Sequence, residues 1–258
     1  MTDELSVAVI TRELGTRIIG RKVLYYPVTT STMDAAREAG REQTTHGTVV
    51  IAEEQTAARG RIKRTWIAPE GNIALSVVLY PCLSNLSSLI MLASLAVVNT
   101  IEAVTGLKSQ IKWPNDVLIN GKKVCGILIE SDLQKNTVNY SIIGIGINVN
   151  LTPADFPEIE SIATSLTIEL GRDVSRLSLT RRLLVEMDSL YQTVLDGGSI
   201  YEPWRDNLVT LGSQVCATTI DEIHEGIAES VDREGSLLLR GSDGKLTRIV
   251  AGDVTLRQ

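Results

Sequence analysis

The fold is decided by residues 110–149, which read QIKWPNDVLINGKKVCGILIESDLQKNTVNYSIIGIGINV. Apolar runs in this stretch are short and are separated by turn residues, as in successive β-strands. Asn120-Gly121 lies between two such runs and predicts a two-residue hairpin, because a type I′ turn requires positive φ at both central positions. The strand after this turn is expected to cover about 122–131, and another is expected to cover 138–149.

Strand and helix patterns alternate upstream of this stretch. Short apolar runs predict strands, and apolar residues three and four apart predict helices. Ser31 or Thr32 is placed to cap a helix that has Asp34 in its first turn. The expected helices cover 4–15 and 86–104, and the expected strands cover 22–28, 48–52 and 72–80.

The pattern changes twice downstream of residue 150. Helical periodicity returns across 161–197, and the segment after Gly212 consists of short apolar runs split by turn residues. Several short strands at this spacing are typical of a small β-barrel. The chain is therefore predicted to be α+β, with a mixed β-sheet domain packed with helices over 1–210 and a small C-terminal barrel over 211–258.

Composition argues against several classes of protein. The 258 residues include 25 Lys+Arg against 31 Asp+Glu, a net charge of −6, whereas proteins that bind nucleic acid are usually basic. Three cysteines without a CxxC motif argue against a disulfide framework and for a reducing, cytoplasmic location. Two histidines far apart in sequence give little basis for a zinc site or a histidine-based triad.

The long uncharged stretch at residues 71–101 is not expected to cross a membrane. Pro81, Asn85 and several serines divide it into apolar pieces shorter than the ~20 residues that a membrane span requires. We expect a buried strand followed by a buried helix. The N-terminal segment has early acidic residues and no long apolar run, so it is not expected to be a signal peptide.

A basic loop at residues 55–66, QTAARGRIKRTW, is the first segment that can carry chemistry. Four cationic side chains lie within six residues, beside a glycine that lets a backbone N–H group approach an anion. Arginine forks suit carboxylate and phosphate oxygens. Two other interpretations stay open at this point: a solvated basic loop, and a loop that contacts RNA phosphates.

Two further segments place polar groups on rigid backbone. In Lys112-Trp-Pro-Asn-Asp116 the proline restricts the tryptophan before it, so the amide and the carboxylate that follow have a fixed place. Lys123 comes just after the hairpin turn, although these residues are also compatible with a plain turn and a solubilising lysine. In Gly144-Ile-Gly-Ile-Asn148 the glycines and Asn148 share one strand face, which predicts the close approach of a ligand or of a packed helix.

Taken together and in this order, these segments resemble the biotin–protein ligase family, of the type without an N-terminal DNA-binding domain. The resemblance covers nearly the whole chain. Only 30 residues precede Ser31, too few for the winged helix-turn-helix of repressor members, so no DNA partner is expected. Gly235–Arg240 and Ala251–Val254 resemble the SH3-like C-terminal domain of that family. The other matching motifs are Ser31-Thr32, Gln55 with Arg59–Arg61 and Trp66, Lys112–Asp116, Lys123–Glu130 and Gly144–Asn148.

The resemblance implies an ATP-dependent ligase that acts in two steps. Biotin and ATP give biotinyl-5′-AMP, and the acyl group then passes to a lysine of a biotin carboxyl carrier domain of acetyl-CoA carboxylase or a related carboxylase. It assigns catalysis to Lys123, Arg59 and Asp116, with Asp116 also near ATP-bound Mg²⁺. It assigns biotin binding to Ser31, Thr32, Met33, Gln55, Arg59, Gly60, Arg61, Lys123 and Gly126, and ATP or adenylate binding to Arg59, Arg61, Trp66, Lys112, Asn115, Lys123 and Asn148.

The sequence departs from the family pattern at Ala58 and Met33, where the family commonly has glycine and asparagine. Alanine would cost ~1–2 kcal/mol if position 58 requires positive φ. Arg257 corresponds to a basic position toward ATP in the family, although a terminal arginine is more often only solvated. A lipoate–protein ligase and a non-catalytic sensor of biotin or a nucleotide stay open as alternatives, and the family suggests a possible homodimer.

Overall fold

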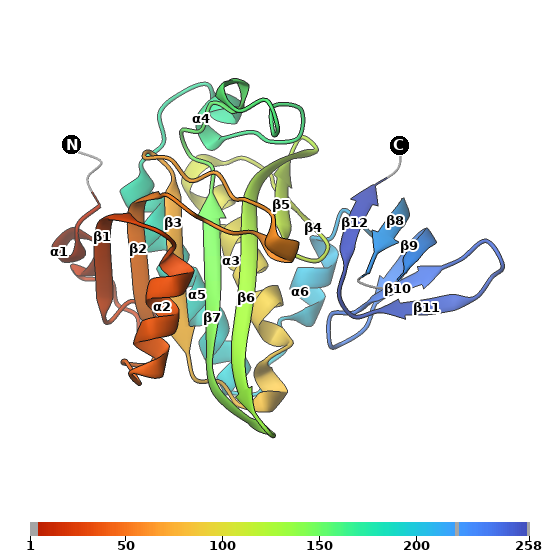
Figure 1. Ribbon diagram of the computed structural model, residues 1–258, viewed down its shortest axis with the longest axis horizontal. Coiled ribbons are helices and arrows are strands. Elements are labelled where there is room, and N and C mark those ends of the chain that lie inside the picture. The colour runs from red at the N-terminus through yellow and green to blue at the C-terminus, as the bar shows by residue number, and fades with distance from the viewer. Residues whose placement is uncertain (1–4, 220–221, 257–258) are drawn as a thin grey trace.

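The computed structural model describes residues 5–219 and 222–256, apart from the side chain of Lys63. The fold contains two β-sheets (Figure 1). The larger sheet has seven strands in the order β1-β2-β3-β7-β6-β5-β4, and the smaller has five in the order β11-β10-β9-β8-β12. In the larger sheet β1 runs parallel to β2 and the other pairs are antiparallel, so the predicted mixed sheet is confirmed.

The elements of the larger unit follow in chain order. Its strands are β1 (Val23–Thr29), β2 (Thr48–Gln55), β3 (Ile73–Leu79), β4 (Gln110–Lys112), β5 (Asp116–Ile119), β6 (Lys122–Gln134) and β7 (Thr137–Ile147). Its helices are α1 (Val7–Thr11), α2 (Thr32–Arg41), α3 (Ser88–Thr105), α4 (Leu166–Leu170), α5 (Arg176–Leu195) and α6 (Tyr201–Asp206).

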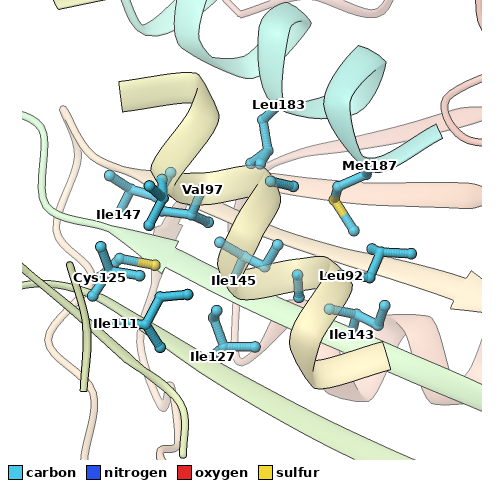
Figure 2. Packing of buried hydrophobic residues seen from close by; sticks show 14 of the residues in the cluster. Leu92, Val97, Ile111, Cys125, Ile127, Ile143, Ile145, Ile147, Leu183 and Met187 are labelled. Atoms are coloured by element: carbon cyan, nitrogen blue, oxygen red, sulfur yellow. The ribbon is translucent and has the colours of Figure 1, made fainter. Parts of the chain in front are cut away.

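The sheet has helices on both faces. Helix α2 packs on one face through Met33 and Ala36, which contact the side chains of β2, β3 and β7. Helix α3 lies on the other face and is itself covered by α5 (Figure 1). The isoleucines of β7 meet α3 in this second layer, as Figure 2 shows for Ile143, Ile145 and Ile147. The alternation predicted for β7 therefore holds, with isoleucines in the core and glycines on the other face.

Helix α3 is long and apolar enough to cross a membrane by length and composition alone, with a mean hydropathy of 1.7. Its place in the fold explains this composition. The helix lies between the sheet and α5, and 61% of its residues are buried. An apolar helix with a protein layer on each side is a core helix. The predicted buried strand and helix over the uncharged stretch are confirmed as β3 and α3.

The predicted hairpin is present between β5 and β6. Asn120 and Gly121 have φ values of 51° and 77°, as a type I′ turn requires. A bulge at Val117/Leu118 shifts the register, so Leu118 pairs with Lys123 and Asp116 pairs with Gly126. The turn thus brings Lys123 back beside the strand that carries Asp116.

Two helix predictions were wrong in extent. The first helix covers only Val7–Thr11, because Arg181 caps its end by donating to the carbonyls of Val9, Ile10 and Arg12. The single periodicity over 161–197 is divided into α4 and α5. Gly171, with φ of 69°, ends α4, and Ser175 starts α5 by accepting a hydrogen bond from Ser178.

The C-terminal strands form a small antiparallel sheet. They are β8 (Gln214–Thr218), β9 (Ile223–Val231), β10 (Leu237–Arg240), β11 (Leu246–Ile249) and β12 (Asp253–Leu256), with β11 and β12 at its edges. Trp113 joins this sheet to the larger one, since its indole Nε1 donates to the carbonyl of Gly235 at 2.8 Å. Its backbone N–H donates to Thr210 at 2.9 Å. The division at 210/211 stays a prediction.

Candidate active site

A cavity of about 610 Å³ lies on the α2 face of the larger sheet, under the basic loop. Its wall combines the start of α2, the basic loop, the glycine face of β6 and β7, and turns that precede α4. One residue of the C-terminal sheet also reaches it. The lining includes Ser31, Thr32, Met33, Gln55, Ala58, Arg59, Gly60, Arg61, Arg64, Trp66, Asn115, Asp116, Lys123, Gly126, Gly144, Gly146, Asn148, Glu158, Ile159, Ile162, Ala163 and Asp253.

Neutral hydrogen bonds hold one end of the cavity. Ser31 caps α2 by accepting a hydrogen bond from the backbone N–H of Met33 at 3.3 Å. Gln55, at the end of β2, accepts from the backbone N–H and the hydroxyl of Thr32 at 2.7 and 3.1 Å. Ser76 of β3 donates to the same Thr32 hydroxyl at 2.8 Å. A helix start and two strand positions therefore fix the polar groups at this end.

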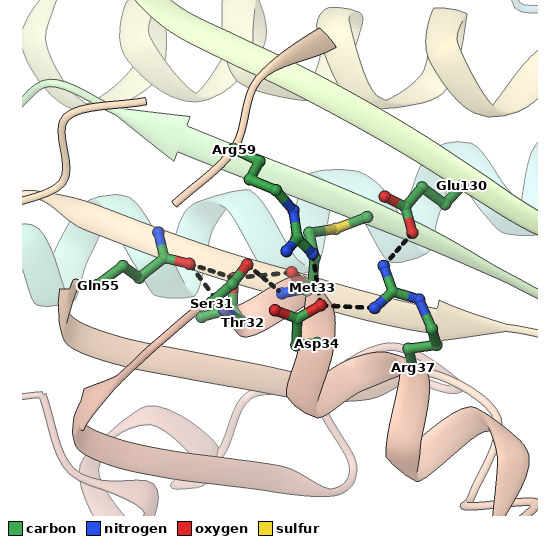
Figure 3. A network of polar contacts seen from close by, with 9 residues as sticks. Ser31, Thr32, Met33, Asp34, Arg37, Gln55, Arg59 and Glu130 are labelled. Atoms are coloured by element: carbon green, nitrogen blue, oxygen red, sulfur yellow. Dashed lines mark hydrogen bonds and ion pairs between the residues drawn. The ribbon is translucent and has the colours of Figure 1, made fainter. Parts of the chain in front are cut away.

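A chain of charges runs from the basic loop across α2 to strand β6 (Figure 3). Asp34 lies between two arginines: Arg59 of the basic loop and Arg37 one helical turn further on. Arg37 also reaches Glu130 of β6 at 2.5 Å. Burial acts to raise the pKa of the Asp34 carboxyl, but hydrogen bonds from Arg59 and Arg37 outweigh it and hold that pKa below its usual value. Asp34 thus anchors one arginine of the loop to α2.

Two more cations face the cavity from the opposite side. Lys123 Nζ lies 2.6 Å from Asp116 Oδ1, and the lysine side chain is 28% exposed. Arg61 donates to Asn115 Oδ1 at 2.9 Å, while the Asn115 amide donates to the carbonyl of Ile127 at 2.8 Å. Burial lowers the pKa of the Arg61 guanidinium, against the opposing charges of Asp253 and Asp116. The guanidinium stays charged, since its ordinary pKa is far above neutrality.

The basic loop is folded as an irregular hairpin. Arg59 pairs with Thr65, and the backbone N–H of Trp66 donates to the carbonyl of Ala58 at 3.0 Å. At its far end Arg64 forms an ion pair with Asp253 of β12. Three arginines thus tie the loop to three separate parts of the fold, which are α2, the β4–β5 connection and the C-terminal sheet.

The strain considered at Ala58 does not arise. Ala58 is buried and is not among the residues of positive φ in the described ranges. The loop's left-handed residue is instead Ile62, which has a φ of 52° and is 63% exposed. A β-branched residue rarely adopts this conformation, so the local backbone is strained there. That strain lies at the tip of the loop rather than at its base.

Side chains of α2 and the loop cover the glycine face of the sheet. Met33 lies against Gly144, and the indole of Trp66 lies against Gly126 and Gly146. Lys123 Nζ is 5.3 Å from the centre of the Trp66 ring, in cation–π range. The close approach predicted from the glycines is therefore made, within the protein itself, by a helix residue and a loop residue.

The structure gathers most of the residues assigned by resemblance. Lys112 is the exception, because its strand position does not line the cavity. Asn148 lines it and donates from its amide to the carbonyl of Thr164 at 3.0 Å. Arg257 lies outside the described residues. Sequence reasoning missed the wall formed by residues 158–163, which the pattern assigned partly to a helix, and it missed Asp253, whose loop partner is far away in the sequence.

The residues that the structure describes hold no group of three His, Cys, Asp or Glu side chains that could bind a metal ion. The carboxylate of Asp116 is already engaged by Lys123. The donor set therefore does not fit a metal ion held by the protein alone. Magnesium often keeps several water ligands and is bound through one or two carboxylates together with substrate phosphates.

Comparison with known proteins first assigns the class. Residues 25–148 match the Biotin/lipoate A/B protein ligase family, and residues 210–257 match the Biotin protein ligase C terminal domain. The chain is 38% identical to the bifunctional ligase/repressor BirA of Bacillus subtilis, over 98% of this chain and 79% of that protein. It is 36% identical to the biotin--[acetyl-CoA-carboxylase] ligase of Paracoccus denitrificans, over 76% of this chain and 85% of that protein.

A solved structure agrees with these matches. The biotin protein ligase of Aquifex aeolicus, in complex with biotin and ATP, superposes with a TM-score of 0.78 and 27% identity, covering 92% of this chain and 99% of that one. The fold and the site thus define a protein ligase of the biotin/lipoate class. Within that class, the chain belongs to the biotin protein ligase family and is an enzyme. The predicted family, fold class and enzyme class are confirmed.

Proposed function

We propose that this chain activates biotin with ATP as biotinyl-5′-AMP and transfers the biotinyl group to a lysine of a biotin carboxyl carrier domain. The observation that carries this proposal is the convergence of Arg59, Arg61 and Lys123 on one cavity that also holds the neutral, hydrogen-bonded group around Thr32. A reaction between a carboxylate and a triphosphate needs such a site, because the two anions repel each other until cations offset their charge.

In the first step, an oxygen of the biotin carboxylate attacks the α-phosphorus of ATP. A new C–O–P linkage forms, the bond to the β-phosphate breaks, and pyrophosphate leaves. Lys123, Arg59 and Arg61 stabilise the charge that develops on the phosphate oxygens. Asp116 holds Lys123 at 2.6 Å, and Asn115 holds Arg61 at 2.9 Å, so these two cations are oriented before the substrates arrive.

In the second step, the neutral amine of the carrier lysine attacks the acyl carbon of the adenylate. The amide C–N bond forms, the acyl C–O bond breaks, and AMP leaves while the amine gives up a proton. Both nucleophiles belong to substrates, so no protein nucleophile is required. This agrees with a site that offers arginine and lysine rather than cysteine or histidine among its lining residues.

Substrate orientation follows from the two ends of the cavity. The Ser31, Thr32 and Gln55 end offers neutral donors and acceptors, which suit the ureido ring of biotin. The cationic end suits the carboxylate and the adenylate phosphate. Met33 and Gly126 complete the biotin site in this proposal, and Trp66 and Asn148 lie toward the adenylate. An ATP role for Lys112 is the least supported, since the lysine does not line the cavity.

Magnesium enters this proposal only with ATP. Bound to the triphosphate, it would offset phosphate charge. Asp116 is the carboxylate that the family resemblance assigns to it. The Lys123–Asp116 pair speaks against a preformed metal site, so no step depends on the ion. We also propose the carrier domain of acetyl-CoA carboxylase or a related carboxylase as acceptor and the cytoplasm as location. The chain is not expected to bind DNA, and a homodimer stays a prediction.

One assay tests the function. Purified protein is given ATP and Mg²⁺ with either biotin or lipoate, in the presence or absence of an apo carrier domain. With ATP and Mg²⁺, biotin but not lipoate should yield pyrophosphate. When the apo carrier domain is present, it should gain a biotinyl amide with release of AMP. Turnover only with lipoate would identify a lipoate ligase. Binding of biotin without pyrophosphate release would identify a sensor and overturn the proposal.

A further inference from the structure

The glycines of the cavity floor lie where a side chain of the protein already covers them. Gly126 of β6 and Gly146 of β7 are direct cross-strand partners, so together they form a small flat platform. A Cβ atom at Gly146 would lie 2.5 Å from Trp66 Nε1 and 2.6 Å from its Cε2. A Cβ atom at Gly126 would lie 2.9 Å from Trp66 Cζ3. The indole therefore rests on both glycines at once.

The same indole contacts the lysine that we assign to catalysis. Lys123 Nζ lies 5.3 Å from the ring centre, while its other partner is the carboxylate of Asp116 at 2.6 Å. A Cβ atom at Gly126 would also lie 3.2 Å from Lys123 Cε. Platform, indole and lysine are thus packed as one unit, and an added methyl group would displace a rigid ring rather than a flexible chain end.

We propose that Gly126 and Gly146 form a seat for Trp66 and that the seated indole is a positioning residue for Lys123. This inference deepens the proposed function, because it rests on the role of Lys123 in that reaction. In this proposal Gly146 acts through the tryptophan of the basic loop, whereas Gly126 both seats the indole and belongs to the biotin site. Seating the indole closes the base of the loop and confines the lysine between the ring and Asp116.

Tryptophan fluorescence reports the seat directly in the ligand-free protein. The chain has three tryptophans, and Trp113 and Trp204 are 2% and 0% exposed, whereas Trp66 is partly exposed. Acrylamide should therefore quench mainly Trp66. In Gly146→Ala the quenching constant should rise, because the displaced indole becomes more accessible. Trp66→Ala gives the baseline of the two buried tryptophans.

A matched control lies on the same strand face. Gly144→Ala adds the same methyl group two residues away, where a Cβ atom would meet Met33 Sδ at 2.5 Å and not the indole. Its acrylamide quenching should equal that of the unmodified chain. Circular dichroism and a thermal melt establish that each variant is folded. If Gly146→Ala does not fold, Gly126→Ala makes the milder contact of 2.9 Å with the indole and carries the quenching test in its place.

A double-mutant cycle separates a seat from a substrate contact. Gly146→Ala alone should slow biotin-dependent pyrophosphate release by about 10- to 100-fold, the scale expected when a catalytic group is misplaced by about 1 Å. On the Trp66→Ala background the same substitution should change the rate by less than about twofold, since its only route of action has been removed. The quenching result does not depend on the identity of the substrate.

Two results overturn the proposal. Unchanged quenching in a folded Gly146→Ala would show that the indole does not use the platform. An equal loss of rate on the Trp66→Ala background would show that the glycine serves the substrate directly. Failure of biotin activity in the unmodified chain, with the quenching shift intact, would instead refute the proposed function and leave the seat in place.

Discussion

The two ends of the cavity are built in different ways. At the Thr32 end, neutral hydrogen bonds join a helix start to two strands, and all the partners belong to regular elements. At the Lys123 end, a charged hydrogen bond and an ion pair join the basic loop to Asn115 and Asp253, which are distant in the sequence. Buried neutral hydrogen bonds give fixed geometry, whereas exposed ion pairs are weak and exchange partners easily. The comparison indicates a rigid recognition end and, at the charged end, a basic loop whose exposed ion pair is adaptable although Asp116 holds Lys123 in place.

The largest expected effect lies at the charged end. Lys123→Ala removes one preorganised electrostatic stabiliser, which typically lowers the rate by about 10²–10³-fold. Pyrophosphate release with biotin and ATP should fall by this factor, while the thermal melt changes little because the side chain is partly exposed. Lys122→Ala is the control, since Lys122 is exposed and lies on the other face of β6. Near-normal release by Lys123→Ala would rule out its role.

The sequence predicts the neutral end better than the charged end, because the neutral end is built from regular elements and the charged end from contacts of a loop. The Ser31 cap, the Asn120-Gly121 turn and the glycine face of β7 depend on neighbouring residues, and local patterns predicted each of them. The residues that anchor the basic loop do not depend on neighbours in the sequence, and no local pattern predicted them. Arg64 and Asp253 are 189 residues apart in the sequence, so no spacing rule pairs them. The wall at 158–163 was missed because the helical periodicity predicted for 161–197 begins inside this segment, which the structure folds as turns.

A smaller but clear effect is expected at the neutral end. Thr32→Val keeps the shape of the side chain but leaves the buried Ser76 hydroxyl without its acceptor and Gln55 Oε1 without one donor. Such a loss costs ~1–3 kcal/mol, or about 5- to 150-fold in binding. Biotin affinity measured by calorimetry should fall by this factor, with little change in its salt dependence.

A matched substitution away from the cavity checks this assignment. Thr193→Val on helix α5 also removes a hydroxyl, one that donates only to the carbonyl of Ser189 on the surface. It should leave biotin affinity unchanged. If Thr32→Val binds biotin as the unmodified chain does, the neutral end does not recognise the head group, and the contrast between the two ends loses its functional meaning.

Protection from trypsin tests whether the charged end is adaptable. Surface ion pairs contribute about 0–1 kcal/mol each, so the basic loop should open often in the free protein. Cleavage after Arg59, Arg61 or Arg64 should be fast without ligand and slow with biotin and ATP, because bound anions add partners for the same cations. Gel analysis of the fragments over time measures this. Equal cleavage in both conditions would show that the loop does not close over substrate.

The smallest expected effect concerns the tie between the loop and the C-terminal sheet. Arg64 is 71% exposed and Asp253 is 28% exposed, so their ion pair is worth at most about 1 kcal/mol, or about fivefold in rate. Arg64→Asp and Asp253→Arg should each slow pyrophosphate release, since like charges then face each other. The combined exchange should restore most of the rate, and high salt should weaken all three differences through screening. If the combined exchange is no faster than the single variants, the pair does not hold the loop, and the C-terminal sheet contributes to the site in another way.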